Sequence, residues 1–362
     1  MNTWGEKIKI SIFGESHGAA VGIVLDGIPS GVELDLEEIK REMQRRAPGR
    51  NSISTPRAEA DEVKILSGFF DGKTTGTPLA GMILNTNTIS KHYQKELVRP
   101  GHADYTGFMR YGMSHDYRGG GHFSGRLTAP LVFAGAVAKQ VVAAYGVTVG
   151  AHILRIGEFW DTAFDAVQVD AEQLRTLWQK EFPVLDWQTG DKMQREIVRQ
   201  RDQLNSIGGI VECAVVGMPP GLGAPFFGSV ESRISSMMFS VPAVKGIEFG
   251  AGFGFAEMTG KEANDEFYMK DGCVKTYTNH NAGINGGITN GMPVVFKAVV
   301  KPTASIAQKQ RTVDIEKMKD AEIEVHGRHD PCITHRAAVV IEAATALVML
   351  DLLLDNGAEG IR

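Results

Sequence analysis

The 362-residue sequence contains little cysteine and no excess of basic residues. Its three cysteines, Cys213, Cys273 and Cys332, are odd in number and far apart, which excludes a disulfide framework and favours a reduced, cytoplasmic compartment. The formal net charge of -5 argues against generic nucleic-acid binding, because proteins of that kind usually carry a basic balance. An acidic total still leaves room for a local basic pocket.

The sequence also lacks the segments that mark several common protein classes. Residues 1–14 contain no apolar signal-peptide core, and the most apolar run, 337–354, contains Glu342 and Asp351. We expect that run to form a buried helix rather than a membrane span. GFFDGKT at 68–74 is one residue short of a phosphate-binding loop, and no G-x-G-x-x-G motif opens a helix after a strand.

Two motifs suggest activities that their surroundings oppose. GESHG at 14–18 fits the nucleophile pattern G-x-S-x-G, but AAVGIVL follows it and predicts a strand where a hydrolase needs a helix. Residues 326–336 contain three histidines, yet their spacing fits no common zinc site and two nearby arginines would oppose a cation. We therefore predict neither a serine hydrolase nor a metal site.

Two pairs of segments in the chain resemble each other. IVLDGIPSG at 23–31 is similar to CAVVGMPPG at 213–221, each an apolar strand closing in a G-x-P-x-G turn. GKTTGTPLAGMIL at 72–84 is similar to GITNGMPVVFKAV at 287–299. In each half a basic, histidine-bearing loop then leads into an alanine-rich helix. The pattern indicates an ancient duplication, and chance similarity of short segments is the alternative.

The duplication predicts a single α/β (α+β) domain, 1–362, made of similar halves at about 1–150 and 206–362. A polar, helical excursion is expected at about 151–205. One helix is predicted to begin after Asp35, which would cap its N-terminus, and another is predicted at about 229–239. If a pseudo-twofold relates the halves, the alanine-rich helices pack centrally between the sheets. The loops at 99–126 and 301–336 would then face one cleft.

The segment 99–126 holds three histidines, four arginines and seven glycines, which is too much glycine for a simple helix. Such a segment either cradles an anion or forms a solvated loop. RRAPGR at 45–50 supplies arginine forks for phosphate or carboxylate, or else a solvated helix end. KPTAS at 301–305 suits a phosphate-bearing ligand or an ordinary turn. His17 and His102 lie in glycine-flanked loops and are candidate proton donors, although a single histidine is more often structural.

Taken together, the motifs resemble those of the chorismate synthase family, in that family's order. They are GESHG, DGIPSG, RRAPG, RPGHADY, the glycine triplet 119–121, NHNAGINGGITNG, KPTASI and GRHDPC. The resemblance implies a 1,4-anti elimination of phosphate from 5-enolpyruvylshikimate 3-phosphate, giving chorismate and requiring reduced FMN. It also implies a β-α-β sandwich, with central helices between antiparallel sheets, that assembles as a homotetramer.

The resemblance also implies roles for individual residues. His17 would lie at the leaving phosphate and His102 near the reduced flavin, each as an acid, and Asp330 would help the flavin accept the substrate proton. Arg46 matches a position tied to substrate and to NADPH. The substrate-binding positions are Arg45, Arg46, Arg50 and Arg126. The flavin-binding positions are His122, Phe123, Ser124, Ala243, Gly286, Lys301, Pro302, Thr303, Ala304, Ser305 and Arg328.

The sequence departs from the family pattern in the block after the glycine triplet. GGGHFSGRLT stands where the family has G-G-G-R-S-S-A-R-E-T, so that His122 replaces an arginine and Phe123 a serine. We expect an external flavin reductase, because the excursion at 151–205 contains no dinucleotide-binding loop. The rival interpretations are a flavin-dependent oxidoreductase and a non-catalytic phosphate-ligand binder.

Overall fold

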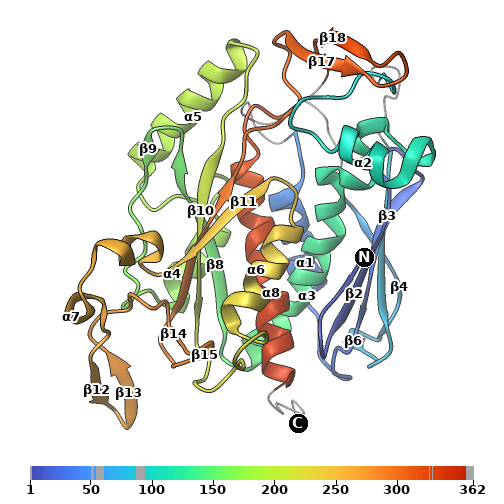
Figure 1. Ribbon diagram of the computed structural model, residues 1–362. Coiled ribbons are helices and arrows are strands. Elements are labelled where there is room, and N and C mark those ends of the chain that lie inside the picture. The colour runs from blue at the N-terminus through green and yellow to red at the C-terminus, as the bar shows by residue number, and fades with distance from the viewer. Residues whose placement is uncertain are drawn as a thin grey trace.

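Two antiparallel sheets enclose a layer of helices in the computed structural model (Figure 1). The structure describes residues 2–49, 53, 61–86, 94–325, 327 and 329–355. The first sheet has the strand order β1-β2-β3-β7-β4 and the second the order β11-β16-β10-β8-β9. The first sheet consists of β1 (Thr3–Trp4), β2 (Lys9–Gly14), β3 (Ala20–Asp26), β7 (Leu79–Leu84) and β4 (Val63–Ser67). The second consists of β11 (Val244–Phe249), β16 (Val294–Val300), β10 (Gly209–Val216), β8 (Thr148–Ile156) and β9 (Phe159–Trp160).

The two sheets share one strand order. In the first, β2, β3, β7 and β4 are neighbours in that order, and β8, β10, β16 and β11 repeat it in the second. The repeated sequence segments fall on equivalent strands, because the G-x-P-x-G turns follow β3 and β10 and the G-x-P turns precede β7 and β16. This correspondence is what a duplicated chain would produce.

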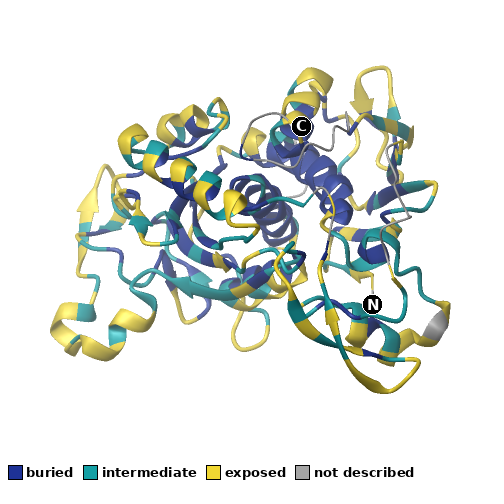
Figure 2. Cartoon of the chain, turned by 90° about the horizontal axis from the view of Figure 1, so that it is seen from above, coloured by how far each residue is buried: buried dark blue, intermediate teal, exposed yellow. Residues whose placement is uncertain are grey.

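The centre of the molecule is made of two long helices, α3 (Thr128–Ala144) and α8 (Thr334–Asp355) (Figure 2). They approach closely at Gly135, where a Cβ atom would lie only 2.4 Å from the Cβ of Ala343. The run Arg118–Ala144, which ends with α3, and α8 are both apolar and long enough to cross a membrane, but both are mostly buried inside the protein. The prediction of a buried helix at 337–354 is therefore confirmed.

Shorter helices flank this central pair. Helix α1 (Leu36–Arg46) begins where the Asp35 carboxylate accepts the backbone N–H groups of Glu37 and Glu38, as its sequence predicted. Helix α6 (Val230–Ser240) occupies the equivalent place in the second half, within one residue of the predicted range. The fold class expected from the sequence, mixed helices and antiparallel sheets, is confirmed.

The excursion between the halves differs from its prediction at one end. Its helices are α4 (Ala171–Trp178) and α5 (Trp187–Asp202), but residues 151–156 continue β8 and belong to the second sheet. The apolar run of β8 is buried on both faces, so it lacks the alternation that marks a half-exposed strand. The second sheet thus begins before the expected boundary at 206.

The remaining elements are short and lie mostly at the ends of the sheets. GFFDGKT, which imitates a phosphate loop, forms the hairpin of β5 (Phe69–Phe70) and β6 (Lys73–Thr74). At the upper end in Figure 1 lie α2 (Asp104–Tyr111) and the hairpin of β17 (Gln310–Asp314) and β18 (Lys319–Ile323). The others are α7 (Gly260–Ala263), β12 (Phe267–Lys270), β13 (Cys273–Thr276), β14 (Ile284–Asn285), β15 (Ile288–Thr289), and the 3-10 helices Gly112–Ser114, Arg118–Phe123, Gly125–Leu127 and Gly252–Glu257.

Candidate active site

The glycine triplet Gly119–Gly121 lies against both candidate histidines. All three residues have positive φ values, of 59°, 83° and 53°, which side-chain-bearing residues rarely adopt. A Cβ atom on Gly119 would lie 2.2 Å from the His17 ring, and one on Gly120 would lie 3.2 Å from Nε2 of His102. The triplet thus brings together two histidines that are 85 positions apart in the sequence.

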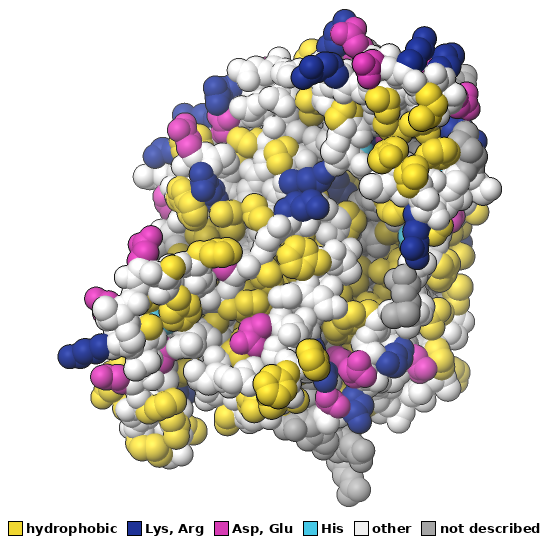
Figure 3. Space-filling view, viewed as in Figure 1, with side chains coloured by type: hydrophobic (Ala, Val, Ile, Leu, Met, Phe, Trp, Pro, Cys, Tyr) yellow, Lys and Arg dark blue, Asp and Glu magenta, His cyan; other side chains and the backbone are white. Residues whose placement is uncertain are grey.

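The loop that carries His102 meets the 301–305 loop of the other half. Nη1 of Arg99 donates to Oγ of Ser305 at 3.1 Å, and Nζ of Lys301 donates to the carbonyl of Gly101. The backbone N–H of Lys301 donates to the carbonyl of Ala243 at 2.9 Å. Lys and Arg side chains, mixed with acidic ones, are visible at this end of the molecule (Figure 3). The two loops predicted to face one cleft are therefore in contact.

A third loop adds His329 and Asp330 to the same place. Burial lowers the pKa of His329 to about 4. The positive charges of Arg99 and His102 also lower this pKa, whereas the negative charge of Asp330 raises it. Oδ2 of Asp330 accepts a hydrogen bond of 2.6 Å from Nη1 of Arg336. All three proposed proton-transfer residues, His17, His102 and Asp330, thus lie on loops that converge at one end of the helix layer.

Buried positive charge is concentrated around Arg46. Its guanidinium pairs with Asp61 and donates to Oγ1 of Thr128 at 3.2 Å, while Arg126 pairs with the other oxygen of Asp61. Nε of Arg336 donates to the carbonyl of Arg46 at 2.9 Å. Burial lowers the pKa of Arg46 to about 10, because the nearby Arg336 and Arg126 offset much of what Asp61 contributes. An anion beside Arg46 would be bound favourably.

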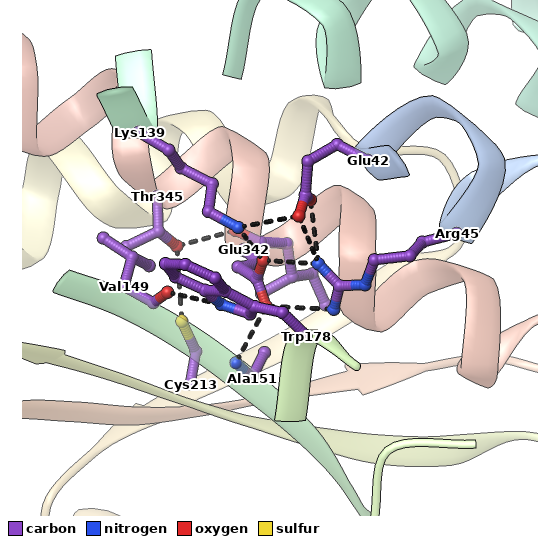
Figure 4. Close-up of polar contacts among 10 residues, drawn as sticks. Glu42, Arg45, Lys139, Val149, Ala151, Trp178, Cys213, Glu342 and Thr345 are labelled. Carbon is purple, nitrogen blue, oxygen red and sulfur yellow. Dashed lines mark hydrogen bonds and ion pairs between the residues drawn. The ribbon is translucent and has the colours of Figure 1, made fainter. Parts of the chain in front are cut away.

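Arg45, the residue before Arg46, is directed to a different cluster (Figure 4). Its guanidinium binds Glu42 and Glu342 at 2.8 Å each, and Lys139 binds the same two carboxylates at 3.0 and 2.6 Å. Nζ of Lys139 also lies 3.7 Å from the ring centre of Trp178. Two cations and two anions balance in this cluster. The predicted substrate-binding role of Arg45 therefore has no support in its geometry.

Several buried polar atoms in the converging loops have no hydrogen-bond partner among the residues that the structure describes. They are Oγ of Ser16, Oγ1 of Thr303 and Nε2 of His329. Buried polar groups are nearly always satisfied, and an unmade hydrogen bond costs about 1–3 kcal/mol. These atoms, with the glycine triplet beside them, are suited to a polar ligand that approaches the backbone closely.

The comparisons with known proteins point the same way. Residues 8–354 match the family model described as chorismate synthase. The chain is 44% identical to the chorismate synthase of Methanothermobacter thermautotrophicus, over 98% of this chain and 95% of that one. It is 45% identical to that of Thermococcus kodakarensis, over 98% of each chain. The chain belongs to the chorismate synthase family.

A solved structure extends the similarity to the fold. A chorismate synthase crystal structure superposes with a TM-score of 0.75 and 27% identity, covering 98% of this chain and 93% of that one. Chorismate synthases are lyases of the shikimate pathway, and as a member of the family this chain is a lyase of that pathway.

The structure does not bring every predicted chorismate synthase position together. Gly286 lies in the β14–β15 turn, before β16, whereas Lys301 directly follows that strand at its other end. Arg50 and Arg328 lie outside the described residues. The catalytic and binding assignments of the others remain predictions.

At the two positions where the sequence departs from the family pattern, both side chains contact protein atoms. Nδ1 of His122 lies 2.8 Å from the carbonyl of Gly14, and Nε2 lies 3.3 Å from the Asn2 side chain. Phe123 packs near Tyr111, with ring centres 6.2 Å apart, and its ring edge covers Gly107. These contacts fasten the loop after the glycine triplet to β2 and α2.

Sequence reasoning missed four charged residues of this site: Arg99, Asp104, Asp61 and Arg336. Arg99 and Asp104 both lie in the RPGHADY motif. The charged residues of that motif were a signal for them, but only its histidine and glycine were considered. Asp61 lies in no recognisable motif, and only the fold shows that it joins Arg46 to Arg126.

Proposed function

We propose that this chain converts 5-enolpyruvylshikimate 3-phosphate to chorismate by 1,4-anti elimination of phosphate, with reduced FMN bound beside the substrate. The observation that carries the proposal is the glycine triplet, which contacts His17 and His102 and lies beside loops rich in arginine. Both substrate and FMN are anions, and backbone amides next to glycine can approach phosphate oxygens closely. The charge concentrated around Arg46 suits the substrate.

The flavin is proposed to bind between the loops 99–104, 119–124 and 301–305. Oγ1 of Thr303 and Nε2 of His329, both buried and without a partner among the described residues, are available to such a ligand. Reduced flavin held there would supply electron density to the breaking bond to phosphate, with no net redox change over the reaction. Ser124, Ala304 and Ser305 stand along the same loops.

The residues have separate tasks in this proposal. His17 protonates the departing phosphate, and His102 holds a proton at the flavin side of the site. Asp330 helps the flavin region accept the substrate proton, and Nη1 of Arg336 donates to its carboxylate at 2.6 Å. Arg46 and Arg126 hold the substrate anion through guanidinium groups whose positions are set by Asp61.

An anaerobic assay tests the proposal against its rivals. The protein is incubated with photoreduced FMN and 5-enolpyruvylshikimate 3-phosphate, and phosphate release and chorismate absorbance are followed together. Equal amounts of phosphate and chorismate are expected. A flavin-dependent oxidoreductase would instead yield a reduced or oxidised product, and a non-catalytic binder would release no phosphate.

Substitutions test the assigned roles. His17→Ala and His102→Ala are each expected to slow turnover by ~10²- to ~10⁴-fold, the usual cost of losing a general acid, while the protein stays folded. Asp330→Asn should retain FMN binding and slow the elimination, because an amide cannot serve as a base or a proton relay as a carboxylate can. Loss of FMN affinity with normal chemistry in the bound enzyme would assign Asp330 a structural role instead.

We further infer that the enzyme is a cytoplasmic homotetramer and depends on a separate flavin reductase. The segment 151–205 forms the end of β8, the short β9, and α4 and α5, which supports the absence of a dinucleotide-binding unit there. Activity is expected with chemically reduced FMN and not with FMN and NADPH in air. NADPH oxidation that depends on FMN, at rates matching chorismate formation, would overturn this inference and favour NADPH binding through Arg46.

A further inference from the structure

The Nδ1 atom of His102 faces two charged groups of its own loop. Oδ1 of Asp104 lies 2.7 Å from Nδ1, and Nη2 of Arg99 lies 3.2 Å from it. The Arg99 guanidinium also binds the Asp104 carboxylate in a bidentate manner: Nη2 donates to Oδ1 at 2.8 Å and Nε donates to Oδ2 at 2.7 Å. All three side chains are less than one-fifth exposed. Asp104, Arg99 and His102 therefore form a network shielded from water.

Asp104 is ionised in this network. Burial alone would raise the pKa of Asp104, but the hydrogen bonds and charges of Arg99 and His102 outweigh it and hold that pKa well below its usual range. An ionised carboxylate only accepts hydrogen bonds, so a ring nitrogen 2.7 Å away has to carry a hydrogen. Arg99 can only donate, so its 3.2 Å hydrogen-bond contact with Nδ1 competes with Asp104 for that nitrogen, and the shorter 2.7 Å contact with the ionised Oδ1 decides the assignment. In the opposite tautomer Arg99 would donate to Nδ1, and a ring lone pair would face the carboxylate.

The other ring nitrogen of His102 faces the glycine triplet. A Cβ atom on Gly120 would lie 3.2 Å from Nε2, so only glycine leaves that nitrogen accessible from the triplet side. We propose that Asp104 is a positioning residue for His102, holding the hydrogen on Nδ1 so that Nε2 exchanges the proton during the reaction. The inference rests on the proposed role of His102 and deepens it.

The proton balance of this step is simple. The doubly protonated ring would break its Nε2–H bond and give that proton to the reduced flavin that is proposed to bind at the glycine-triplet face. The ring is left neutral with its hydrogen on Nδ1, still bonded to Asp104, and Nε2 regains a proton from water. Asp104 stays ionised throughout and stabilises the charged ring, as the aspartate of a Ser-His-Asp triad does. Arg99 also donates a 3.1 Å hydrogen bond to Ser305, which connects the Arg99–His102–Asp104 network to the second half of the chain.

Nuclear magnetic resonance tests the tautomer without any ligand or turnover. The full chain is labelled with ¹³C and ¹⁵N in histidine and measured in the solid state, and the signals of His102 among the 10 histidines are assigned by their loss in His102→Gln. We expect the neutral ring to carry its hydrogen on Nδ1. In Asp104→Asn both tautomers should appear, because an amide can donate to Nδ1 as well as accept from it. A wild-type ring with its hydrogen on Nε2, bonded by Arg99, would overturn the proposal.

Kinetics test the consequence for the reaction. Asp104→Asn should lower kcat by ~10²- to ~10⁴-fold with little change in KM, because the ring is mispositioned for proton transfer while substrate contacts remain. Asp104→Glu, which keeps the carboxylate, should recover part of the loss. Asp104 also accepts the backbone N–H of Arg99 at 3.0 Å. The matched control is therefore Asp170→Asn, because the Asp170 carboxylate accepts a backbone N–H at the start of α4, and this variant should keep wild-type kcat.

The outcomes separate the possible failures. If Asp104 is only structural, Asp104→Asn will lower the melting temperature but leave the His102 signals and the kcat of the folded enzyme unchanged. If His102→Ala itself is fully active, the proposed role of His102 fails, yet the tautomer measurement still decides whether Asp104 orients the ring. Unaltered kcat in Asp104→Asn beside an impaired His102→Ala would overturn the positioning role alone.

Discussion

Arg45 and Arg46 are neighbours on α1, yet they belong to two clusters with different charge and purpose. Arg45 and Lys139 are matched by Glu42 and Glu342, and the bonds to those carboxylates hold the pKa of Arg45 above its usual range despite burial. Arg46 is also buried, and burial lowers its pKa to about 10, because Arg336 and Arg126 offset much of what Asp61 contributes. A balanced cluster stabilises the helix layer, whereas Arg46 and Arg126 share the single carboxylate of Asp61, and it is this second cluster that we propose for an anionic ligand.

The comparison is tested most strongly by removing an anion from the balanced cluster. Glu342→Ala leaves Arg45 and Lys139 buried with a single carboxylate between them, and breaking a buried ion pair in this way typically costs about 3–5 kcal/mol. Urea unfolding should show that loss in the free energy of unfolding, while kcat/KM of the folded enzyme stays near wild type. Glu37→Ala, which removes an exposed ion-pair carboxylate of α1, the helix that carries Arg45, is the control. A loss below about 1 kcal/mol would contradict the structural role.

A smaller effect is expected from the arginine of the other cluster. Arg46→Lys keeps the charge but loses the planar fork, so hydrogen bonds to Asp61 and to the substrate anion are weakened. We expect kcat/KM to fall by ~10- to ~150-fold, the equivalent of about 1.5–3 kcal/mol for charged hydrogen bonds. Arg45→Lys is the matched variant and should reduce stability without that catalytic loss. Equal catalytic losses in both variants would erase the distinction between the clusters.

Buried histidines show the same contrast between matched and unmatched groups. His335 has no acidic hydrogen-bond partner among the residues that the structure describes, and burial lowers its pKa to about 4, as it does for His329. Burial would also lower the pKa of His152, but hydrogen bonds from its ring to Asp161 and Glu212 outweigh that effect and raise it. The two kinds of histidine should therefore affect stability at opposite ends of the pH range.

The pH dependence of unfolding checks this contrast. An unfolded histidine binds its proton near pH 6.5, so His335 and His329 cost stability as pH falls from about 6.5 towards 4, by at most ~1.4 kcal/mol per pH unit each. His335→Gln should flatten this acid limb of a plot of unfolding free energy against pH. The stability contributed by His152 is present below pH 6.5 and is lost as pH rises through its raised pKa, so His152→Gln should alter the alkaline limb instead. An unchanged acid limb in His335→Gln would contradict the assignment.

The smallest effect should come from a pair that belongs to neither cluster. Asp191 and Arg195 form an ion pair on the surface of α5, with side chains 46% and 76% exposed. Exposed pairs contribute at most ~1 kcal/mol, so Asp191→Ala should change the free energy of unfolding by less than that in urea titrations. A larger loss would mean that burial is not what separates the balanced cluster from an ordinary ion pair.

Much of the fold could be predicted from local patterns. The strands after the repeated turns, the Asp35 cap and the apolar run of α8 each follow from hydrogen bonding or burial within a few residues of sequence. The start of the second sheet could not be placed, because β8 is buried on both faces and has no alternating pattern. The direction of Arg45 was equally hidden, since its partner Glu342 lies 297 positions away.

The sequence by itself determined that this chain has two similar halves, that its glycine-rich cationic loop suits anions, and that its motifs are those of chorismate synthase. These properties depend on residue type and spacing, which act locally. Only the tertiary structure decided that Arg45 lies in a charge-balanced cluster while Arg46 shares the carboxylate of Asp61 with Arg126, and that Asp104 lies beside the ring of His102. The physical reason is that ion pairing and tautomer selection depend on which charges meet within about 3–4 Å, and the packing of both halves decides that distance.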